Sequence, residues 1–433
     1  MRRVAVIGSG IAGLSTAYAL RHQAQVTLFE ADGRFGGHAH TVDVTLDGVT
    51  HGVDTGFLVF NHRTYPQLVR LFEELQVPTV ASEMSFSVQS PASDLEWSGC
   101  SLNTVFAQRR NLLSPRFLGM LADILRFNRL ATGLAERGAE HELQMAIGDF
   151  LDQHRFGAVF REGYLLPMIG CIWSCPTDQM LRFPIATLIR FCHNHGLIQV
   201  ADRPQWHTVQ GGSRQYVQRL MAHLPDCRAA TPVRGVRRLP PGQGTAGVLV
   251  ATDAGAERFD DVVLACHSDQ SLALLDDAGP DERAVLGAIR YQRNRALLHT
   301  DATMLPRRRL AWAAWNYERA ADARQEQAGV CLHYLINRLQ SLPWQQPVLV
   351  SLNPCREPAP RSVIGEYDYS HPVFDSAAIA AQRRLGDIQG HSHLWFAGAW
   401  TRYGFHEDGL MSGLAVAEGL MQRWAANTLA QAA

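Results

Sequence analysis

The feature that most constrains the fold is a glycine turn that directly follows the first strand-like segment. Arg3 to Ile7 is a short β-branched run, and Gly8, Gly10 and Gly13 follow it with the spacing G-x-G-x-x-G. From Ile11 to Leu20 the apolar residues recur with helical spacing. A strand, a glycine turn and a helix in this order make the first half of a βαβ unit. The pattern therefore predicts an α/β fold.

A second strand and an acidic residue complete the unit. Gln25 to Glu30 is the next strand-like segment, and Glu30 stands 17 residues after Gly13. In such units the glycines allow a tight turn, close approach to a pyrophosphate and close helix packing, and the acid accepts hydrogen bonds from a ribose. The helix N-terminus offers free N–H groups to the phosphates. We therefore predict a dinucleotide site, and Glu30 argues against a ribose 2′-phosphate and hence against NADP.

Two further segments extend the predicted site. Gly36 and Gly37 can bring the backbone close to a ligand, and Arg34 can pair with phosphate. The segment from Asp43 to Asp54 alternates around an Asp-Gly dipeptide, which predicts a hairpin. Asp54, Thr55 and Gly56 close it.

With these motifs the sequence resembles the flavin-containing amine oxidase superfamily, which includes monoamine and polyamine oxidases, phytoene desaturases and protoporphyrinogen oxidase. Val209 to Ser213, Phe259 to His267, Phe396 to Gly398 and Gly409 to Gly413 are similar to later family segments. The resemblance implies an α/β fold, a two-domain FAD-dependent oxidoreductase with a Rossmann-like FAD domain and a mixed α+β substrate domain. The FAD-binding residues that it implies are Gly8, Gly10, Ile11, Ala12, Gly13, Glu30, Arg34, Gly36, Gly37, Asp54, Thr55, Gly56, Gly398, Gly409 and Leu410.

We expect a discontinuous FAD-binding domain from residues 1–60, 205–270 and 390–433. The remaining residues, 61–204 and 271–389, form the expected substrate or cap domain. The segment from Trp400 to Gly409 has no cysteine for a covalent flavin link, so we expect non-covalent FAD, although His406 could in principle attach it. His406, Glu407 and Asp408 are expected to precede the last helix, where they either line the flavin or complement the helix dipole.

The most unusual feature of the composition is the absence of lysine, because all 40 basic residues are arginine. This excludes a Schiff-base lysine and a P-loop lysine. Amine oxidases of the superfamily typically hold a lysine near the hydride-accepting nitrogen of the flavin, and this chain lacks it. No catalytic residue can be assigned. The candidates lie between the last two family segments, Phe396 to Gly398 and Gly409 to Gly413, and are Trp400, Tyr403 and His406.

The middle of the chain resembles an uncharacterised bacterial group of predicted FAD-binding oxidoreductases. The residues that carry this resemblance are Leu166 to Ser174, Phe191 to Gly196 and Asp202 to Trp206. Members of that group look like the N-terminal portion of plant cyclopropane fatty-acid synthases, and bacterial members often accompany such synthases. The resemblance therefore implies acyl-lipid chemistry and a cyclopropane fatty-acid synthase-like partner.

The expected function is an FAD-dependent oxidoreductase that oxidises or desaturates an apolar substrate, a fatty-acyl chain or lipid, by hydride transfer to flavin. Two alternatives remain open. One is a flavin amine oxidase that acts on a small amine. The other is a non-catalytic flavin-binding accessory subunit of a lipid-modifying complex.

Charge and patterning bear on the partners and the compartment. The formal charge of −1 argues against nucleic acid, and no export signal or spanning segment is recognisable, so a cytoplasmic protein with reduced thiols is expected. The segment from Arg109 to Leu130 is basic and amphipathic. It predicts either peripheral contact with an anionic membrane or, the reading we favour, a cap-domain helix with a solvated arginine face.

No metal site is expected. Three H-x-H pairs occur, His38/His40, His193/His195 and His391/His393, but a metal site needs further ligands at fixed geometry, and the first pair already lies in the predicted flavin segment. Cys171 and Cys175 are four residues apart and do not match a CxxC pair.

We expect the purified protein to be yellow and to release intact FAD when it is denatured. Glu30→Ala should weaken FAD binding, because two ribose hydroxyls lose charge-assisted hydrogen bonds worth about 1.5–3 kcal/mol each. The absorbance of the supernatant after denaturation measures the released flavin. A colourless protein that cannot be reconstituted with FAD would contradict the prediction, and flavin that stays with the denatured chain would contradict its non-covalent part.

Overall fold

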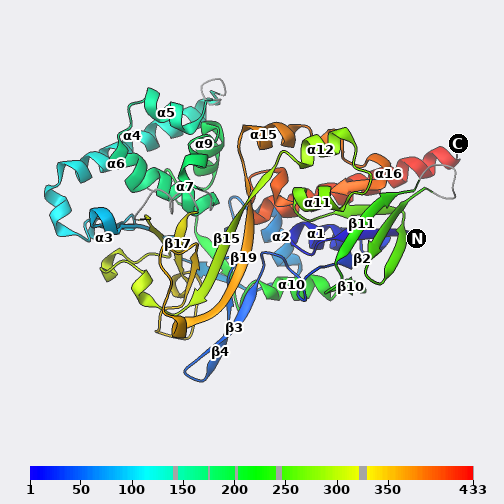
Figure 1. The fold of residues 1–433 in the computed structure, drawn as a ribbon, viewed down its shortest axis with the longest axis horizontal. Helices are drawn as coiled ribbons and strands as arrows, with labels where there is room; N and C mark the ends of the chain where they lie inside the picture. The colour runs from blue at the N-terminus through cyan, green and yellow to red at the C-terminus, as the bar shows by residue number, and fades with distance from the viewer. Residues whose placement is uncertain (140–144, 174–175, 200–202, 240–245, 321–328, 433) are drawn as a thin grey trace.

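The chain builds two main sheets, one at each side of a central cavity. The structure is a computed structural model that describes residues 1–139, 145–173, 176–199, 203–239, 246–320 and 329–432. One sheet has five strands and the other has seven. Figure 1 shows both termini beside the five-stranded sheet, and the labelled helices between residues 102 and 194 gathered at the opposite side. The fold is mixed α/β, as predicted.

The five-stranded sheet is parallel throughout. Its strands, in the order β10-β2-β1-β14-β20, are β10 (Asp226–Arg228), β2 (Ala24–Phe29), β1 (Arg2–Ile7), β14 (Asp261–Leu264) and β20 (Leu394–Phe396). The strand order reverses between β1 and β14. In open α/β sheets ligands bind at such a switch point, beyond the carboxyl ends of the strands.

Strand β1 is buried on both faces, as its β-branched composition predicts. Val4 and Val6 pack in the core with α1 (Ile11–Leu20) and α16 (His406–Ala432). Ala5 and Ile7 point to the opposite core. That core is shared with the three-stranded sheet of β11 (Val233–Arg238), β12 (Val248–Thr252) and β13 (Gly255–Phe259).

The pattern of this part of the chain predicts two boundaries that differ from the structure. The run from Arg258 to Ala265 has the pattern of one strand but forms two, because β13 ends at Phe259 and β14 begins at Asp261. The segment from Pro232 to Gly247 has the composition of a loop or hairpin, and β11 within it pairs antiparallel with β12; residues 240–245 lie outside the described residues. Helix α16 begins at His406 rather than at Gly409, so His406 to Asp408 form its first turn.

The seven-stranded sheet has the order β19-β15-β18-β17-β16-β7-β8. Its strands are β7 (Phe86–Ser90), β8 (Leu95–Ser98), β15 (Arg290–His299), β16 (Trp315–Glu318), β17 (Cys331–Leu335), β18 (Leu349–Leu352) and β19 (Val363–Val373). Two smaller sheets accompany it, the predicted hairpin of β3 (Thr41–Leu46) and β4 (Val49–Asp54), and the sheet of β5 (Phe60–Asn61), β9 (Trp206–Val209) and β6 (Thr79–Ser82).

The remaining helices cover these sheets. They are α2 (Pro66–Glu74), α3 (Leu102–Val105), α4 (Pro115–Arg137), α5 (Ile147–Gln153), α6 (Ala158–Phe160), α7 (Leu166–Trp173), α8 (Thr177–Met180), α9 (Ile185–Asn194), α10 (Arg214–Met221), α11 (Ser268–Leu274), α12 (Pro280–Leu286), α14 (Ile336–Leu339) and α15 (Ser376–Arg383). In the described part of the chain, no helix has both the length and the apolar character needed to cross a membrane.

The predicted domain limits stay a prediction. Helices α12 and α15 fall in the expected substrate domain, yet Val285, Leu286, Ala378 and Ala381 join the core on the five-stranded sheet. Helices α12 and α15 therefore pack with the five-stranded sheet, although the sequence places them in the substrate domain.

Helices α1 and α16 cross at a contact that only glycine permits. A Cβ atom at Gly413 would lie 2.3 Å from the carbonyl oxygen of Ala12 and 2.3 Å from the hydroxyl of Ser15. The hydroxyl of Thr16 donates a 3.1 Å hydrogen bond to the carbonyl oxygen of Gly413. The backbones of the two helices are thus in direct contact.

We expect Gly413→Ala to destabilise the protein by about 1–3 kcal/mol, because the added methyl group forces the two helices apart. The matched control is Gly119→Ala in α4, where an added Cβ meets nothing within 4 Å. That change should stabilise its helix by up to about 1 kcal/mol. Thermal unfolding midpoints measure both effects, and a Gly413→Ala protein as stable as the parent would contradict the close crossing.

Candidate functional site

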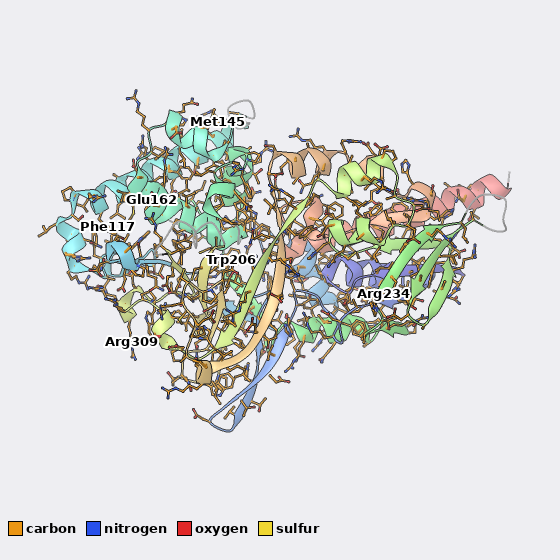
Figure 2. The ribbon with its side chains drawn as sticks, in the orientation of Figure 1. Phe117, Met145, Glu162, Trp206, Arg234 and Arg309 are labelled. Carbon is orange, nitrogen blue, oxygen red and sulfur yellow. The ribbon has the colours of Figure 1, made fainter. Side chains whose placement is uncertain are left out.

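A continuous cavity of about 850 Å³ lies at the carboxyl ends of β1 and β14 and extends toward the seven-stranded sheet. Glu30 and Arg234 line one end, while Met84, Trp206 and Trp315 line the other. Figure 2 shows Arg234 beside the five-stranded sheet and Trp206 near the middle of the molecule. Pockets of about 300–1,000 Å³ are typical of small-molecule and cofactor sites.

The glycine turn has the geometry that its motif predicts. Gly8 has φ +104°, and a Cβ there would lie 2.8 Å from the carbonyl oxygen of Ala265. A Cβ at Gly13 would lie 1.9 Å from the carbonyl oxygen of Gly8, so helix α1 packs directly on the turn. A Cβ at Gly10 would meet nothing within 4 Å, because Gly10 faces the cavity. The turn therefore leaves open space where a pyrophosphate would approach.

The N-terminus of α1 is ready to hold an anion. Its first turn has no acidic residue, and no side chain caps it. Ile11 and Ala12 line the cavity at this point, so N–H groups of the first turn and the positive end of the helix dipole face the ligand space.

Glu30 lies at the end of β2, where the ribose is expected. One carboxylate oxygen accepts hydrogen bonds from the backbone N–H of Ser9 at 3.0 Å and from its hydroxyl at 2.5 Å. The other accepts from the backbone N–H of Asp32 at 2.9 Å. A carboxylate has about four lone-pair sites, so the fixed carboxylate can still accept hydrogen bonds from ribose hydroxyls.

The second glycine segment closes the same wall. Gly36 donates its N–H to the carbonyl oxygen of Ser9 at 3.1 Å. A Cβ at Gly37, which has φ +58°, would lie 3.0 Å from the Cα of Gly10. Arg34 lines the cavity and donates a 2.8 Å hydrogen bond to the carbonyl oxygen of Gly37.

Asp54 and Thr55 support the site from behind and do not line the cavity. Asp54 accepts hydrogen bonds from the hydroxyl of Thr41 at 2.6 Å, the backbone N–H of Ser213 at 2.9 Å and the amide of Gln340 at 2.9 Å. It therefore joins the β3–β4 hairpin to the start of α10 and to the residue after α14. Burial raises the pKa of its carboxyl to about 6.

Some of the remaining predicted site residues line the cavity and others lie outside it. Gly398, Trp400 and His406 line the cavity together with Gly56. Tyr403 does not line it. Gly36, Gly13, Gly409 and Leu410 belong to the packing around it, and a Cβ at Gly409 would lie 2.8 Å from the Cγ2 of Ile11.

The three polar residues in the first turn of α16 have two roles: one lines the cavity, and the other two accept hydrogen bonds from backbone N–H groups. His406 stacks on Phe57 with ring centroids 3.9 Å apart, and its Nε2 lies 2.7 Å from the hydroxyl of Tyr216. Glu407 accepts hydrogen bonds from the backbone N–H groups of Gln67 and Leu68, so it caps α2. Asp408 accepts from the backbone N–H just before its own helix. Of the three, His406 alone lines the cavity.

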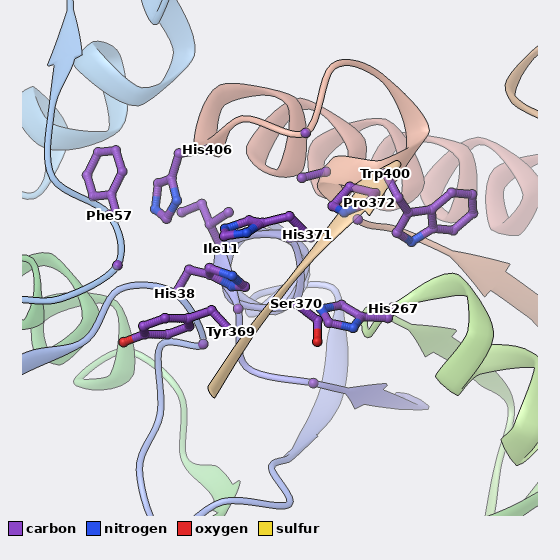
Figure 3. Close-up of a pocket in the computed structure, with 18 of the residues that line it drawn as sticks. Ile11, His38, Phe57, His267, Tyr369, Ser370, His371, Pro372, Trp400 and His406 are labelled. Atoms are coloured by element: carbon purple, nitrogen blue, oxygen red, sulfur yellow. The ribbon is translucent and has the colours of Figure 1, made fainter. Parts of the chain in front are cut away.

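Three cavity residues that the sequence did not indicate as site residues come from β19 and from the segment after Gly37. The ring of His38 lies 5.1 Å from that of Tyr369 and 5.3 Å from that of His371, measured between centroids. Figure 3 shows these rings together beside Ile11 and His406. The buried Nε2 of His38 has no hydrogen-bond partner among the described residues. This orphaned polar atom on the cavity wall is suited to a cofactor heteroatom.

The imidazoles of this group are uncharged at neutral pH. Burial lowers the pKa of His371 to about 4 and that of His406 to about 3. Burial, reinforced by the neighbouring histidines, lowers the pKa of His38 well below its ordinary value.

Histidines of the H-x-H pairs have separate neighbours in the structure. His38 faces the cavity, while His40 contacts Tyr369 and Thr55. His195 stacks on Phe191 with centroids 3.9 Å apart. Cys175, Ser174 and Asp202, which belong to other segments singled out in the sequence, lie outside the described residues.

These observations fit FAD. The open space at Gly10, the uncapped α1 and the fixed carboxylate of Glu30 suit an adenosine diphosphate, and the orphaned Nε2 of His38 suits a polar ring. When it is bound there, FAD supplies hydride acceptance. The protein groups hold it, orient it and exclude water.

A family model confirms this assignment. Residues 11–294 match the family of flavin containing amine oxidoreductases, and the matched segment is more than half of the chain. The chain belongs to this family. It is therefore an FAD-dependent oxidoreductase, and its cofactor prediction is confirmed at this level.

Solved structures of low sequence identity share the fold. A fatty acid isomerase from P. acnes that produces CLA aligns with a TM-score of 0.67 at 16% identity over 98% of both chains. Putrescine oxidase bound to putrescine aligns at 0.66 with 16% identity over 97% of this chain and 99% of that one. Cyclohexylamine oxidase from Brevibacterium oxydans IH-35A aligns at 0.66 with 14% identity over the same shares. A search of curated protein sequences finds no significant match.

Because these buried histidines are neutral, we expect the folded protein to lose stability in acid. Histidines of the unfolded chain titrate near pH 6.5, so between about pH 6.5 and 4 the unfolded state takes up protons that folded His371 excludes. The free energy of unfolding is therefore highest above pH 6.5 and falls as the pH drops through this window. His371→Gln should make the slope shallower by up to about 1.4 kcal/mol per pH unit.

Unfolding midpoints between pH 7.5 and 4.5, at saturating FAD, measure this slope. The control is His22→Gln at an exposed position. Equal slopes for the parent and for His371→Gln would show that the pKa of His371 is not lowered.

Proposed function

We propose that this oxidoreductase oxidises or desaturates an apolar substrate, a fatty-acyl chain or lipid, by hydride transfer to flavin. The observation that carries the proposal is the composition of the cavity end farthest from Glu30. Met84, Ile172, Leu197, Trp206 and Trp315 line it. The acidic residues of the cavity wall are Glu30 and Asp32 at the adenosine end and the exposed Asp368 on β19.

The aromatic residues at this end form two packed groups. Phe191 stacks on Phe405 with centroids 4.6 Å apart, and His195 stacks on Phe191. Trp315 and Tyr334 pack edge to face at 4.8 Å. Burial lowers the pKa of His195 to about 4, so it adds no charge at neutral pH. A substrate that carries an ammonium group would lose its hydration here without a carboxylate partner, which is costly.

An exposed apolar surface supports access from a membrane. We call it the leucine surface; it consists of Leu102, Leu112, Leu113, Leu118 and Leu125. Leu102 is 80% exposed and Leu113 is 87% exposed. The other face of helix α4 is buried through Phe117, Met120, Phe127 and Ala131. The helix therefore packs on the protein and also carries exposed leucines on its outer face.

Arginines surround the leucine surface. Arg109, Arg110, Arg116 and Arg129 are exposed, and α3 contacts the turn of Arg309–Ala311, which adds the exposed Arg309. Figures 1 and 2 place α3, Phe117 and Arg309 at the edge of the molecule remote from the five-stranded sheet. Leucines among arginines suit an anionic bilayer, where apolar burial and charge attraction add. The resemblance to the cyclopropane fatty-acid synthase group points to the same class of substrate.

Anaerobic reduction of the bound flavin tests the proposal. Free fatty acids and phospholipids in anionic vesicles are compared with primary amines and polyamines, and bleaching of the flavin absorbance is the readout. We expect an acyl lipid to reduce the flavin and amines to be poor substrates. Rapid reduction by an amine would favour the amine oxidase alternative. No reduction by any compound, with FAD bound, would favour the accessory-subunit alternative.

Sedimentation with vesicles tests the leucine surface separately. Leu112→Ser with Leu113→Ser should reduce sedimentation with anionic vesicles without loss of FAD, and added salt should weaken binding by the parent protein. The matched control is Val363→Ser with Ile364→Ser, which changes exposed apolar residues on β19. Equal binding by both double variants would remove the leucine surface from the proposal and leave the substrate class to the reduction experiment.

A further inference from the structure

One face of the seven-stranded sheet carries a buried row of polar side chains that the flavin site does not use. Trp315 and Tyr334 point to the cavity, so their neighbours in sequence point to the other face. In the strand register Gln89 pairs with Glu318, Glu318 with Cys331, and His333 with Ser351. None of these five residues is more than 6% exposed. A buried polar row of this kind needs partners or a ligand.

Three of these side chains converge on one point. The Nε2 of His333 lies 3.0 Å from a carboxylate oxygen of Glu318 and 3.5 Å from the Sγ of Cys331. All three donor atoms lie within 4.8 Å of one another. A second cysteine is next to them, because Cys355 donates its backbone N–H to the Sγ of Cys331 at 3.2 Å.

We propose that Glu318, Cys331, His333 and Cys355 form a binding site for a thiophilic divalent cation of the Zn²⁺ type. Thiolate, imidazole and carboxylate are the ligands of tetrahedral zinc, with Zn–S near 2.3 Å and Zn–N near 2.0 Å. Those bond lengths place neighbouring ligand atoms about 3.3–3.8 Å apart. The observed separations of 3.0 and 3.5 Å need only small adjustments to reach that geometry.

A second layer of hydrogen bonds holds the ring of His333. Its Nδ1 lies 2.6 Å from the hydroxyl of Ser351, which lies 2.7 Å from the Nε2 of His299. The backbone N–H of Asp301 donates to the Nδ1 of His299 at 3.1 Å. Metal-ligating histidines almost always donate their second N–H to a hydrogen-bond acceptor, most often a carboxylate, a backbone carbonyl or water, and here the serine hydroxyl takes that position. Cation uptake then leaves the ring proton of His333 on Nδ1, with the hydroxyl of Ser351 as its acceptor.

The site has an entrance and a balanced charge. Glu318, Cys355 and Arg356 line a second cavity of about 730 Å³, which is distinct from the flavin cavity. Two thiolates, one carboxylate and a divalent cation sum to −1. The guanidinium of Arg356, whose Nε lies 3.7 Å from Glu318, offsets that charge. Uptake of one cation releases the two thiol protons to solvent, so affinity should rise with pH.

The test uses the FAD-bound full chain, treated with a chelator and kept with a phosphine reductant so that the thiols stay reduced. It is titrated with Co²⁺, followed by Zn²⁺. We expect one Co²⁺ per chain with thiolate charge-transfer and tetrahedral d–d bands, and displacement by Zn²⁺. Cys331→Ser and Cys355→Ser should abolish these bands, while Cys192→Ser, a buried thiol in α9, should keep them.

Two further variants separate cation binding from folding. Ser351→Ala should weaken Zn²⁺ affinity about 10–100-fold while FAD content is unchanged. Glu318→Gln keeps the side-chain volume and should also lose affinity, so it replaces any cysteine variant that fails to retain FAD. A parent protein that shows no thiolate band and retains no zinc overturns the proposal. Bands that persist in both cysteine variants overturn it as well. The inference does not rest on the proposed substrate, since neither flavin reduction nor vesicle binding enters the test.

Discussion

The site depends on backbone contacts that leave no room for a side chain. Gly13 rests on the carbonyl of Gly8, and Gly413 rests on the carbonyl of Ala12. These contacts fix the turn after β1 and bring α1 and α16 together where both helices begin. Two positive helix ends therefore face one cavity, one beside the glycine turn and the other behind His406. A larger residue at either glycine would separate the helices and open the space that must hold the cofactor.

The seven-stranded sheet serves two purposes because neighbouring residues of a strand point to opposite faces. On β16 and β17, Trp315 and Tyr334 complete the apolar end of the cavity, while Glu318 and His333 meet on the other face. The two faces are chemically independent, since one is apolar and the other is a continuous hydrogen-bonded row. A change on the polar face can therefore leave the side chains of the flavin wall in place.

Sequence reasoning succeeded where the signal is local. The periodicity of Arg3 to Ile7, the helix from Ile11 to Leu20 and the hairpin around Asp47 and Gly48 agree with the structure to within a residue or two. It failed where contacts join distant segments. His371 reaches the cavity only because β19 pairs with β15, and Glu318 meets Cys331 only through strand register. Neither pairing leaves a short motif, and polar residues on a buried face look like solvent-exposed ones in the sequence.

The absence of lysine and the burial of histidines determine the charge of the flavin region. With no lysine, the fixed positive charge near the cofactor is limited to arginine and helix dipoles, and Arg34 lines the cavity. The rings of His38, His371 and His406 stay neutral because burial makes their protonation costly. The middle of the cavity is thus polar but uncharged, and its far end is apolar. Such a gradient would order a ligand by polarity. The N-terminus of α1 at Gly10 would hold a diphosphate, Glu30 would accept hydrogen bonds from a ribose, and a hydrocarbon would lose least beside Trp206 and Trp315.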